Sequence, residues 1–361
     1  MEENKFNICI IGAGIIGLSI AYKLSQFYKN IIVVEKESTF GQHVSSRNSE
    51  VVHSGFYYPP DSLKAKLCVK GNKLLYKFAD NFKIAYKKCG KMIVANNTSD
   101  FSLLDNIKKN AMSNGVHASI LSPYSSKKIE SRVKALKSLW IPSTGIIDTH
   151  GIMSKLQSLA LSNDVTFLYN HTIEKINFNK KIYTINLDKT KDVIKTDIVI
   201  NAGGLWAHKI SSMIGLNEYV VEYYKGDYYK CTSLKNLNCL VYPTPGVASL
   251  GIHTVLGLDG GVSFGPNMYK VSRVDYSIDK KYHDEYYNEI NKFLDIEKND
   301  IYPDFSGIRP KIKFENKFND FIIKNEIENG YNNFINLIGI DSPGVTSSLA
   351  IADYVYEIIS K

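Results

Sequence analysis

The chain has 361 residues, 44% of them hydrophobic, 22% charged and 12% aromatic, with a formal net charge of +8. This composition excludes a disordered or collagen-like chain, and the length exceeds the size at which one hydrophobic core stops growing, so two domains are expected. The positive charge favours an anionic ligand or an acidic membrane surface. Because the lysines are dispersed and no zinc-finger, homeodomain or RNA-binding signature is present, no nucleic-acid partner is expected.

The five cysteines include no CxxC pair, which indicates a reducing compartment. An apolar strand begins within a few residues of the N-terminus and leaves no room for a signal or transit peptide. No apolar run reaches the roughly 20 residues that span a bilayer. We therefore expect a cytoplasmic protein, with peripheral contact at the inner face of the membrane as its only membrane association.

Hydrophobic periodicity predicts a βαβ unit at the start of the chain, antiparallel strands in its middle and a strand followed by a helix at its end. Strands are expected at residues 6–11, 31–34, 91–95, 197–200, 223–229, 260–264 and 334–340, helices from the first glycine-rich turn to about 27, at 62–82 and at 345–359, and a small β-meander at 166–187. The first and last strands would share one sheet. We predict an α/β fold in which a Rossmann-like dinucleotide-binding domain, residues 1–80, 145–215 and 305–361, carries an inserted antiparallel-sheet α+β substrate domain, residues 81–144 and 216–304.

A glycine-rich turn, Gly12-x-Gly14-x-x-Gly17, joins the first strand to the first helix. The first glycine permits the tight bend, the second lets a pyrophosphate approach the backbone, and the third lets the helix pack closely on the strand. The unpaired N–H groups and the dipole at the helix N-terminus then stabilise the phosphate charge. Glu35 ends the second strand, where its carboxylate can accept hydrogen bonds from ribose hydroxyls and would repel a 2′-phosphate, so NADP is disfavoured.

This motif alone does not separate NAD from FAD. Two later strands, at 197–200 and 334–340, run into glycine turns that contain Gly203 and Gly344. These turns give the sheet more sites of close backbone approach than one NAD needs. A helix that starts near Gly344 could also point its positive end at a flavin, whose pyrimidine side gains negative charge on reduction. We therefore favour FAD, although a simple helix start also explains Gly344.

Several longer segments carry a more specific pattern. They are SSRNSEVVHSGFYYPP at 45–60 with SLKA at 62–65, KGDYY at 225–229, LGIH at 250–253, FGPN at 264–267, GIRP at 307–310 and IGIDSPG at 338–344. On these segments and their order, the chain resembles the D-amino-acid oxidase/glycerol-3-phosphate dehydrogenase superfamily of FAD enzymes, and within it the L-2-hydroxyglutarate dehydrogenases (oxidases). The resemblance spans nearly the whole chain. It implies that FAD is the cofactor, with Ser45 and Arg47 among its contacts, and that L-2-hydroxyglutarate is oxidised to 2-oxoglutarate by hydride transfer to flavin N5.

The chain departs from this family in two places. Thr254 and Val255 follow His253 where the family more often has an aromatic and then a hydroxyl residue, and the segment between Asp275 and Asp304 is short and divergent. These departures leave the site of the second substrate carboxylate unassigned. The mitochondrial presequence of eukaryotic members is absent, which favours a bacterial-type cytoplasmic enzyme.

Oxidation of a 2-hydroxy acid needs a site for the carboxylate and a base for the hydroxyl proton. Arg309 is the candidate carboxylate ligand, because its guanidinium can hold a carboxylate bidentately and resembling flavoenzymes place an arginine of a G-x-R-P segment over the flavin. Histidine titrates near working pH, so His253 and His53 are the candidate bases. We assign the base to His253 and a flavin- or substrate-positioning role to His53. The remaining histidines lack HExxH-type spacing, and the chemistry needs no metal.

The turn Gly265-Pro266-Asn267 is a candidate for the floor of the active site, with Asn267 as a contact to the substrate. Lys225 and Tyr229 are weaker candidates for contacting the distal carboxylate. Two alternative functions stay open. The first is an FAD amine or amino-acid oxidase, or a glycerol-3-phosphate dehydrogenase, on the same fold. The second is a flavin- or NAD-binding regulator without enzymatic activity. Quinone and oxygen both stay open as electron acceptor.

Overall fold

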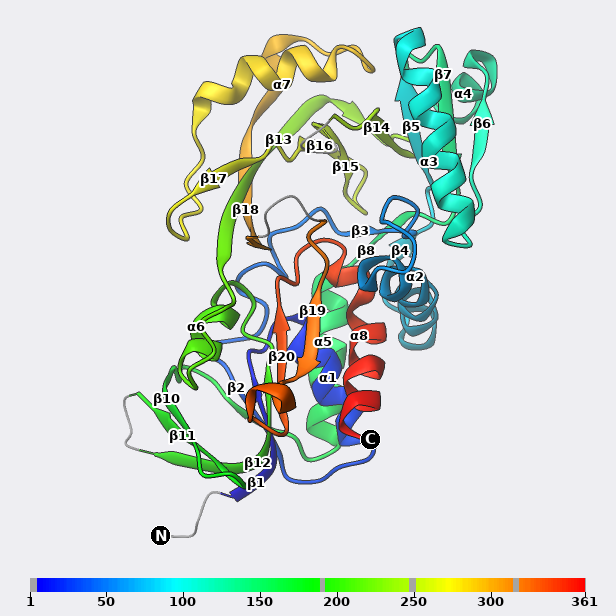
Figure 1. The fold of residues 1–361 in the computed structure, drawn as a ribbon. Helices are drawn as coiled ribbons and strands as arrows, with labels where there is room; N and C mark the ends of the chain where they lie inside the picture. Colours follow the sequence, from blue (N-terminus) through cyan, green and yellow to red (C-terminus); the bar gives the residue numbers. More distant parts are fainter. Residues whose placement is uncertain (1–4, 189–191, 247–250, 314–317, 361) are drawn as a thin grey trace. The chain divides into compact units, whose positions relative to one another are not determined.

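A computed structural model describes residues 5–188, 192–246, 251–313 and 318–360 (Figure 1). Leu250, which begins one of the family-like segments, lies outside the described residues. The chain divides into two compact units, and both are discontinuous. Unit 1 consists of Met1–Ser46, Thr149–Tyr223 and Arg309–Lys361, and unit 2 of Arg47–Asp148 and Tyr224–Ile308.

Unit 1 is built on an eight-stranded sheet. Its order is β10-β11-β12-β1-β2-β9, with β20 also paired to β12 and β19 paired to β20. The strands are β1 (Lys5–Ile11), β2 (Ile31–Val34), β9 (Thr166–Leu168), β10 (Ile173–Phe178), β11 (Tyr183–Leu187), β12 (Val193–Asn201), β19 (Ile322–Asn325) and β20 (Phe334–Ile338). Because β12 pairs in parallel with both β1 and β20, the first and last strands share one sheet, as the sequence predicts.

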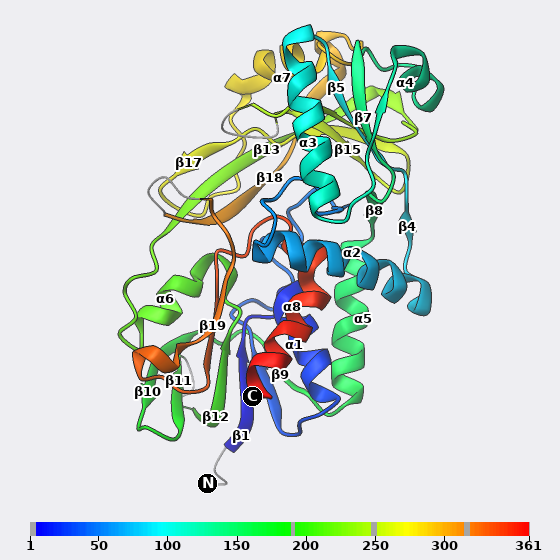
Figure 2. The ribbon, with the colours of Figure 1, turned by 45° about the vertical axis from the view of Figure 1, so that its right-hand side comes forward.

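Three helices of unit 1 pack together beside this sheet. Helix α1 lies against both α5 and α8, and Figure 2 shows the three side by side. The helices of the unit are α1 (Ile15–Ser25), α5 (Thr149–Ser162), α6 (Ala207–Ser212) and α8 (Gly344–Ile359), with short 3-10 turns η2 (Gly204–Trp206) and η5 (Glu326–Asn329). Cys9, Val199 and Phe334, from three neighbouring strands, are fully buried in the core that the sheet forms with its covering elements. The apolar runs of β1, β2 and β20 are typical of parallel strands that are covered on both faces.

The expected meander at 166–187 is only partly correct. Strands β10 and β11 are antiparallel and continue into β12, but β9 pairs in parallel with β2. Helix α5 directly precedes β9 and packs on α1, so β9 enters the sheet after a helix as a parallel strand instead of starting a hairpin. Hydrophobic alternation reports which face of a strand is buried and carries no information about its partner.

Unit 2 contains three smaller sheets. Their orders are β15-β16-β13-β17 with β18 on β13, β14-β5-β7-β6, and β3-β8-β4. The strands are β3 (Val51–Val52), β4 (Tyr86–Lys87), β5 (Lys91–Ala95), β6 (Ser119–Leu121), β7 (Lys137–Ile141), β8 (Gly145–Ile147), β13 (Val221–Lys235), β14 (Leu240–Pro243), β15 (His253–Leu256), β16 (Gly261–Gly265), β17 (Tyr269–Val271) and β18 (Ile301–Ile312). The helices are α2 (Leu63–Phe82), α3 (Phe101–Ser113), α4 (Pro123–Ile129) and α7 (His283–Ile290), with 3-10 turns η1 (Thr98–Asp100), η3 (Lys280–Tyr282) and η4 (Lys298–Asp300). Strands β13 and β16 are antiparallel, as expected, whereas β14 and β5 run parallel.

The boundaries of the units differ from the expected ones, most of all at residues 47–80. These residues were expected in the dinucleotide-binding domain and belong to unit 2. Helix α2 shows the reason, because its Asn72 Nδ2 donates to the backbone oxygens of His53, at 2.9 Å, and Ser143, at 3.0 Å. Both acceptors lie in unit 2, and β3 pairs with β8 of the same unit. An amphipathic helix does not reveal in its sequence which of two cores it covers.

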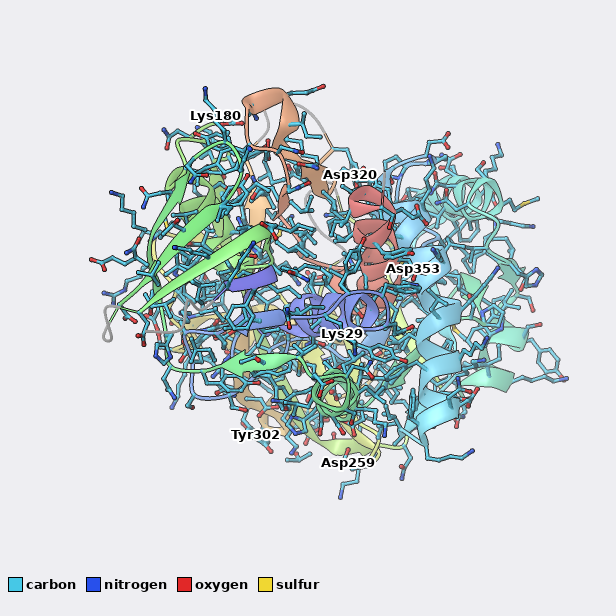
Figure 3. The ribbon with its side chains drawn as sticks, turned by 90° about the horizontal axis from the view of Figure 1, so that it is seen from below. Lys29, Lys180, Asp259, Tyr302, Asp320 and Asp353 are labelled. Atoms are coloured by element: carbon cyan, nitrogen blue, oxygen red, sulfur yellow. The ribbon has the colours of Figure 1, made fainter. Side chains whose placement is uncertain are left out.

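The surface of unit 1 carries charged side chains on separate turns. Lys29 and Lys180, both labelled in Figure 3, are exposed between α1 and β2 and between β10 and β11, respectively. All five cysteines are buried and carry free thiols. Among the described residues, no helix has the length and apolar character needed to cross a membrane.

Candidate active site

The glycine-rich turn between β1 and α1 has no room for side chains at its first and third glycines. Gly12 has a φ of +105°, and a Cβ there would lie 2.6 Å from the backbone oxygen of Ala202. A Cβ on Gly17 would lie 1.9 Å from the backbone oxygen of Gly12. The first glycine therefore brings the turn against the end of β12, and the third brings α1 against the turn.

Backbone donors gather where α1 begins. Gly14 precedes the helix, no acidic residue occupies its first turn, and the Ile15 N–H donates to the buried Ser45 hydroxyl at 3.0 Å. The first N–H groups of a helix have no partner within the helix, and with the helix dipole they attract an anion. A Cβ on Gly14 would stand 3.1 Å from Ser45 Oγ. A side chain at position 14 would therefore crowd the N-terminus of α1, which glycine leaves open to a ligand. Such an arrangement fits a pyrophosphate.

Glu35 joins the turn to the loop that follows β2. Its Oε2 accepts from the Ala13 N–H at 2.7 Å, and its Oε1 accepts from the Glu37 N–H at 2.9 Å. A carboxylate has about four acceptor sites, so two remain for other donors such as ribose hydroxyls. The predicted ribose contact is compatible with this geometry and stays a prediction.

A second glycine turn, at the end of β12, is held by a chain of buried side-chain hydrogen bonds. The Gly203 N–H donates to Asn201 Oδ1 at 3.2 Å, and Asn201 Nδ2 donates to Asn336 Oδ1 at 2.8 Å. Asn336 Nδ2 in turn donates to Glu326 Oε1 at 2.7 Å. Since Asn201, Asn336 and Glu326 are fully buried, this chain fixes the turn that touches Gly12.

Gly344 is the first residue of α8, which agrees with the helix start that the sequence pattern predicts. Its N–H donates to the Asp341 backbone oxygen at 2.6 Å, and a Cβ there would be 3.0 Å from Ile340 Cγ2. The position is therefore crowded by its own turn. That the N-terminus of α8 points at a flavin stays a prediction.

A cluster of charged and aromatic side chains follows Glu35, and no sequence pattern predicted it. Lys36 Nζ lies 3.2 Å from the centre of the Trp206 ring, and His43 packs edge-on against the same ring at 4.7 Å. His43 Nε2 lies 2.8 Å from Glu37 Oε1. This hydrogen bond lowers the pKa of Glu37, while burial lowers the pKa of His43. Lysine and tryptophan separated by 170 positions show no pattern in the sequence, so only the fold reveals their contact.

His253, the candidate base, lies in unit 2. It begins β15, is 6% exposed, and its Nδ1 lies 2.7 Å from the backbone oxygen of Gly251. A carbonyl oxygen only accepts, so the proton of the neutral ring is on Nδ1 and the lone pair is on Nε2. The ring stacks on Tyr242 with centroids 3.8 Å apart, which fixes its orientation.

His53, the second candidate, follows strand β3 in the same unit. Its backbone oxygen accepts from Asn72 Nδ2 at 2.9 Å and from Cys68 Sγ at 3.6 Å. Helix α2 therefore fixes the main chain at His53. Among the described residues of unit 2, both candidate histidines occupy positions fixed by neighbouring elements.

The two arginines of the predicted site lie in different units. Strand β18 begins in unit 2 and ends in unit 1, and Arg309 is its first residue in unit 1. Arg309 is half-buried, and none of the described carboxylates forms an ion pair with it. Arg47 begins unit 2, where its guanidinium lies 4.1 Å from the centre of the Tyr276 ring and its backbone oxygen would stand 2.4 Å from a Cβ on Gly307. The predicted roles of Arg309 in substrate binding and of Arg47 in FAD binding stay predictions.

The weaker substrate candidates are engaged in the interior of unit 2. Asn267 Oδ1 accepts from the Asp227 N–H at 2.9 Å, and Tyr229 stacks on Tyr286 at 4.2 Å with no exposed surface. Burial raises the pKa of Tyr229 to about 12. Lys225 Nζ donates to the backbone oxygen of Ser277. These contacts give all three a structural role in the sheet, and their contact with substrate is untested.

A sequence comparison decides the family. The family described as FAD dependent oxidoreductase (DAO) matches residues 7–358. The chain belongs to this family.

Relatives of this FAD dependent oxidoreductase, and the solved structure of another protein that it resembles, agree with that assignment. The chain is 33% identical over 403 residues to a mitochondrial L-2-hydroxyglutarate dehydrogenase of Arabidopsis thaliana, covering 98% of this chain and 83% of that protein. It is 30% identical over 269 residues to an L-2-hydroxyglutarate dehydrogenase of Escherichia coli (strain K12), covering 73% of this chain and 64% of that protein. A dithionite-reduced L-α-glycerophosphate oxidase of Mycoplasma pneumoniae with FAD bound superposes with a TM-score of 0.89 at 26% identity, covering 100% of this chain and 96% of that one.

FAD is the cofactor of this oxidoreductase, and unit 1 fits it. Three features suit a dinucleotide: the open N-terminus of α1 for the pyrophosphate, the close packing at Gly12 and Gly17, and the remaining acceptor sites of Glu35 for ribose hydroxyls. When bound, FAD supplies a hydride acceptor.

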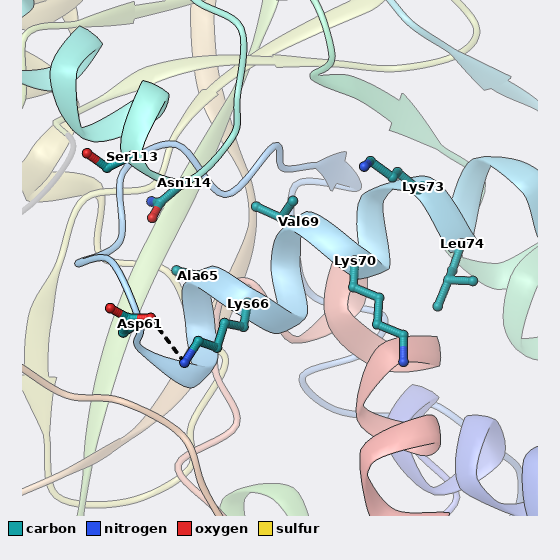
Figure 4. Close-up of a pocket in the computed structure, with 9 residues that line it drawn as sticks. All are labelled: Asp61, Ala65, Lys66, Val69, Lys70, Lys73, Leu74, Ser113 and Asn114. Atoms are coloured by element: carbon teal, nitrogen blue, oxygen red, sulfur yellow. Dashed lines mark ion pairs between the residues drawn. The ribbon is translucent and has the colours of Figure 1, made fainter.

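A groove lies along helix α2 in unit 2 of this oxidoreductase. Its volume is about 520 Å³, and Figure 4 shows Lys66 beside Asp61, with which it forms an exposed ion pair at 3.2 Å. The lining residues are Asp61, Ala65, Lys66, Val69, Lys70, Lys73, Leu74, Ser113 and Asn114. None of them is a predicted catalytic or substrate residue, so this groove does not mark the active site.

Proposed function

We propose that this FAD dependent oxidoreductase oxidises L-2-hydroxyglutarate to 2-oxoglutarate. The observation that carries the proposal is the 33% identity to the Arabidopsis thaliana L-2-hydroxyglutarate dehydrogenase over 98% of this chain. The predicted residues supply the groups that this reaction needs, namely a guanidinium for the carboxylate and a histidine for the hydroxyl proton.

In this proposal, Arg309 binds the carboxylate next to the reacting carbon. Its planar fork presents paired N–H donors, which fix the direction of the C2–H bond as well as the position of the substrate. Its lack of an ion-paired carboxylate among the described residues leaves the guanidinium available for this role.

His253 takes the hydroxyl proton. The hydrogen bond from Nδ1 to the Gly251 oxygen supports this role, because it places the lone pair on Nε2. Loss of that proton develops the carbonyl of the 2-oxo acid, and FAD, when bound, would supply the acceptor for the C2 hydride. His53 positions flavin or substrate from the turn that α2 holds.

The test is an anaerobic titration of the purified, FAD-loaded protein with a panel of hydroxy acids and amino acids. L-2-Hydroxyglutarate should bleach the oxidised-flavin band faster than D-2-hydroxyglutarate, L-lactate or any amino acid, and 2-oxoglutarate should form in equal amount. Faster bleaching by an amine or amino acid would reject the proposal in favour of an amine or amino-acid oxidase.

A second candidate is the oxidation of glycerol 3-phosphate. It is favoured by the 26% identity and TM-score of 0.89 to the Mycoplasma pneumoniae L-α-glycerophosphate oxidase. Glycerol 3-phosphate therefore belongs in the titration panel. If it bleaches the flavin faster than L-2-hydroxyglutarate does, oxidation of glycerol 3-phosphate becomes the favoured function. We propose quinone or oxygen as the electron acceptor, in a cytoplasmic enzyme. Reoxidation of the reduced protein by each acceptor would distinguish them.

A further inference from the structure

Lys91 is a buried cation in unit 2. It begins strand β5, and only 1% of its surface is exposed. No carboxylate of the described residues forms an ion pair with it. Burying a charge without a counter-charge costs free energy, and in this protein burial lowers the pKa of Lys91 to about 7. The fold therefore keeps a group that weakens it.

The ammonium of Lys91 lies among the residues that support both candidate histidines. Its Nζ is 3.7 Å from the centre of the Tyr242 ring, and this ring stacks on His253. It is also 5.7 Å from the centre of the Phe56 ring, three positions after His53. The nearby titratable groups are the thiols of Cys68 and Cys89, and Cys68 donates to the backbone oxygen of His53.

We infer that Lys91 binds the carboxylate at the far end of the substrate and so determines the preference for a dicarboxylate. This inference rests on the proposed function, because L-2-hydroxyglutarate carries two carboxylates and Arg309 accounts for one. The distal anion would provide the counter-charge that Lys91 lacks in the protein alone.

Two physical effects favour Lys91 over the lysine that the sequence suggested. One N–H of the Lys225 ammonium already donates to the Ser277 oxygen, whereas the ammonium of Lys91 faces the electron-rich faces of two rings. Such rings hold a cation weakly and leave its N–H donors for a stronger acceptor. In surroundings of low dielectric constant, the attraction between an ammonium and an arriving carboxylate is much stronger than in water.

If Lys91 had only a structural role, its substitution would have a different effect from the one that carboxylate binding predicts. If the aliphatic chain and its ring contacts served only packing, replacement would affect all substrates alike. If the ammonium binds the distal carboxylate, replacement affects only substrates that have one. The ratio of kcat/KM for two substrates of equal length therefore separates the two roles.

The experiment compares the full-length, FAD-loaded protein with Lys91→Met, which keeps the length of the side chain and removes its charge. The substrates are L-2-hydroxyglutarate and L-2-hydroxyvalerate, which has a methyl group in place of the distal carboxylate. Lys91→Met should lower kcat/KM for L-2-hydroxyglutarate roughly ten- to hundredfold, the usual effect of losing a hydrogen bond to a charged group, and leave L-2-hydroxyvalerate nearly unchanged. Calorimetric titration with 2-oxoglutarate and 2-oxovalerate should show the same selectivity in Kd.

Lys137→Met is the matched control. Lys137 begins β7, which pairs with β5 in the same sheet, and its ammonium forms an ion pair with Asp105 at 3.1 Å. This control should leave both substrates unaffected. Lys91→Gln, which keeps donor groups without the charge, is the second variant and should show the same selectivity as Lys91→Met.

An equal loss for both substrates in Lys91→Met, with FAD retained, would reject the inference and assign Lys91 to packing. Unchanged kinetics with both would reject it as well. A wild-type protein whose flavin is not reduced by L-2-hydroxyglutarate would overturn the proposed function first, and the inference with it. The wild-type titration therefore separates the two failures.

Discussion

The ring of His253 stacks on the ring of Tyr242, with centroids 3.8 Å apart and planes inclined by 20°. Two contacts thus orient the imidazole, this stacking and the hydrogen bond from Nδ1 to Gly251. A base that is held in two ways has little freedom to turn Nε2 away from its substrate.

Tyr242→Leu should therefore slow flavin reduction, by up to about 10²-fold, because a flexible aliphatic chain does not hold the ring of His253 in one plane. Tyr242→Phe keeps the stacked ring and should stay close to wild type. Rapid-mixing absorbance at the oxidised-flavin band measures both. Equal rates for the leucine and phenylalanine variants would show that the stacking does not orient the base.

His253→Asn should keep FAD and substrate affinity and slow flavin reduction on the order of 10²–10⁴-fold, the usual effect of losing a positioned base. His53→Asn should change the affinity for substrate or flavin more than the rate of reduction. The same rapid-mixing experiment, with FAD content determined for each variant, separates the two roles. If His53→Asn shows the larger loss of rate, the assignment of the base must be reversed.

Gly14→Leu should yield a colourless protein, whereas the wild type should be yellow and release FAD on denaturation. The φ of Gly14 is −71°, so the substitution adds bulk at the N-terminus of α1 without strain in the backbone. Gly115→Ala is the control, because Gly115 has a φ of +70° and no atom within 4 Å of its added Cβ. It adds strain of about 1 kcal/mol without bulk. Release of FMN, or full FAD in the leucine variant, would contradict the dinucleotide site.

Arg309→Lys should raise KM and lower kcat together, with a loss in kcat/KM on the order of 10²-fold. A compact ammonium does not reproduce the paired N–H donors that orient a carboxylate. Steady-state kinetics with L-2-hydroxyglutarate and an artificial acceptor would measure both constants. Wild-type constants in this variant would remove Arg309 from the active site.

Lys91→Met should stabilise the protein most at low pH. The pKa of Lys91 falls from 10.5 to about 7 on folding, so between these values the unfolded chain binds more protons and the stability of the wild type rises with pH. Below pH 7 the lysine is charged in both states and its full cost is present. The gain in Tm from Lys91→Met should thus be larger at pH 6 than at pH 9. A gain that does not depend on pH would show that the ammonium is not the source of the cost, and Lys137→Met serves again as the control.

The sequence predicted those features of the fold that depend on neighbouring residues. The expected strands at 31–34 and 91–95 match β2 and β5, and the expected helix at 62–82 matches α2, whose Ser62 hydroxyl accepts from the Ala65 N–H. These features follow from local patterns of apolar and capping residues.

The shared sheet of the first and last strands was predicted, but other features that depend on contacts between distant segments were missed. The parallel pairing of β9 with β2 and the membership of residues 47–80 in unit 2 depend on which surfaces meet. Lys91 was missed for the same reason, since a lysine before an apolar strand reads as an exposed strand end. Its burial depends on Tyr242 and Phe56, which are 151 and 35 positions away in the chain.

The sheet of unit 1 also sets an order of events during synthesis. Strand β1 pairs with β12, β12 pairs with β20, and α1 packs against α8, the last helix. Strand β1 and helix α1 are therefore synthesised well before β20 and α8, which cover their apolar faces. The residues of unit 2 are synthesised in the interval. Domains generally fold as units during synthesis, yet unit 1 completes its core only after α8 has left the ribosome. Nascent chains arrested before Gly344 should for that reason retain no flavin and depend on chaperones, whereas released full-length chains should bind it.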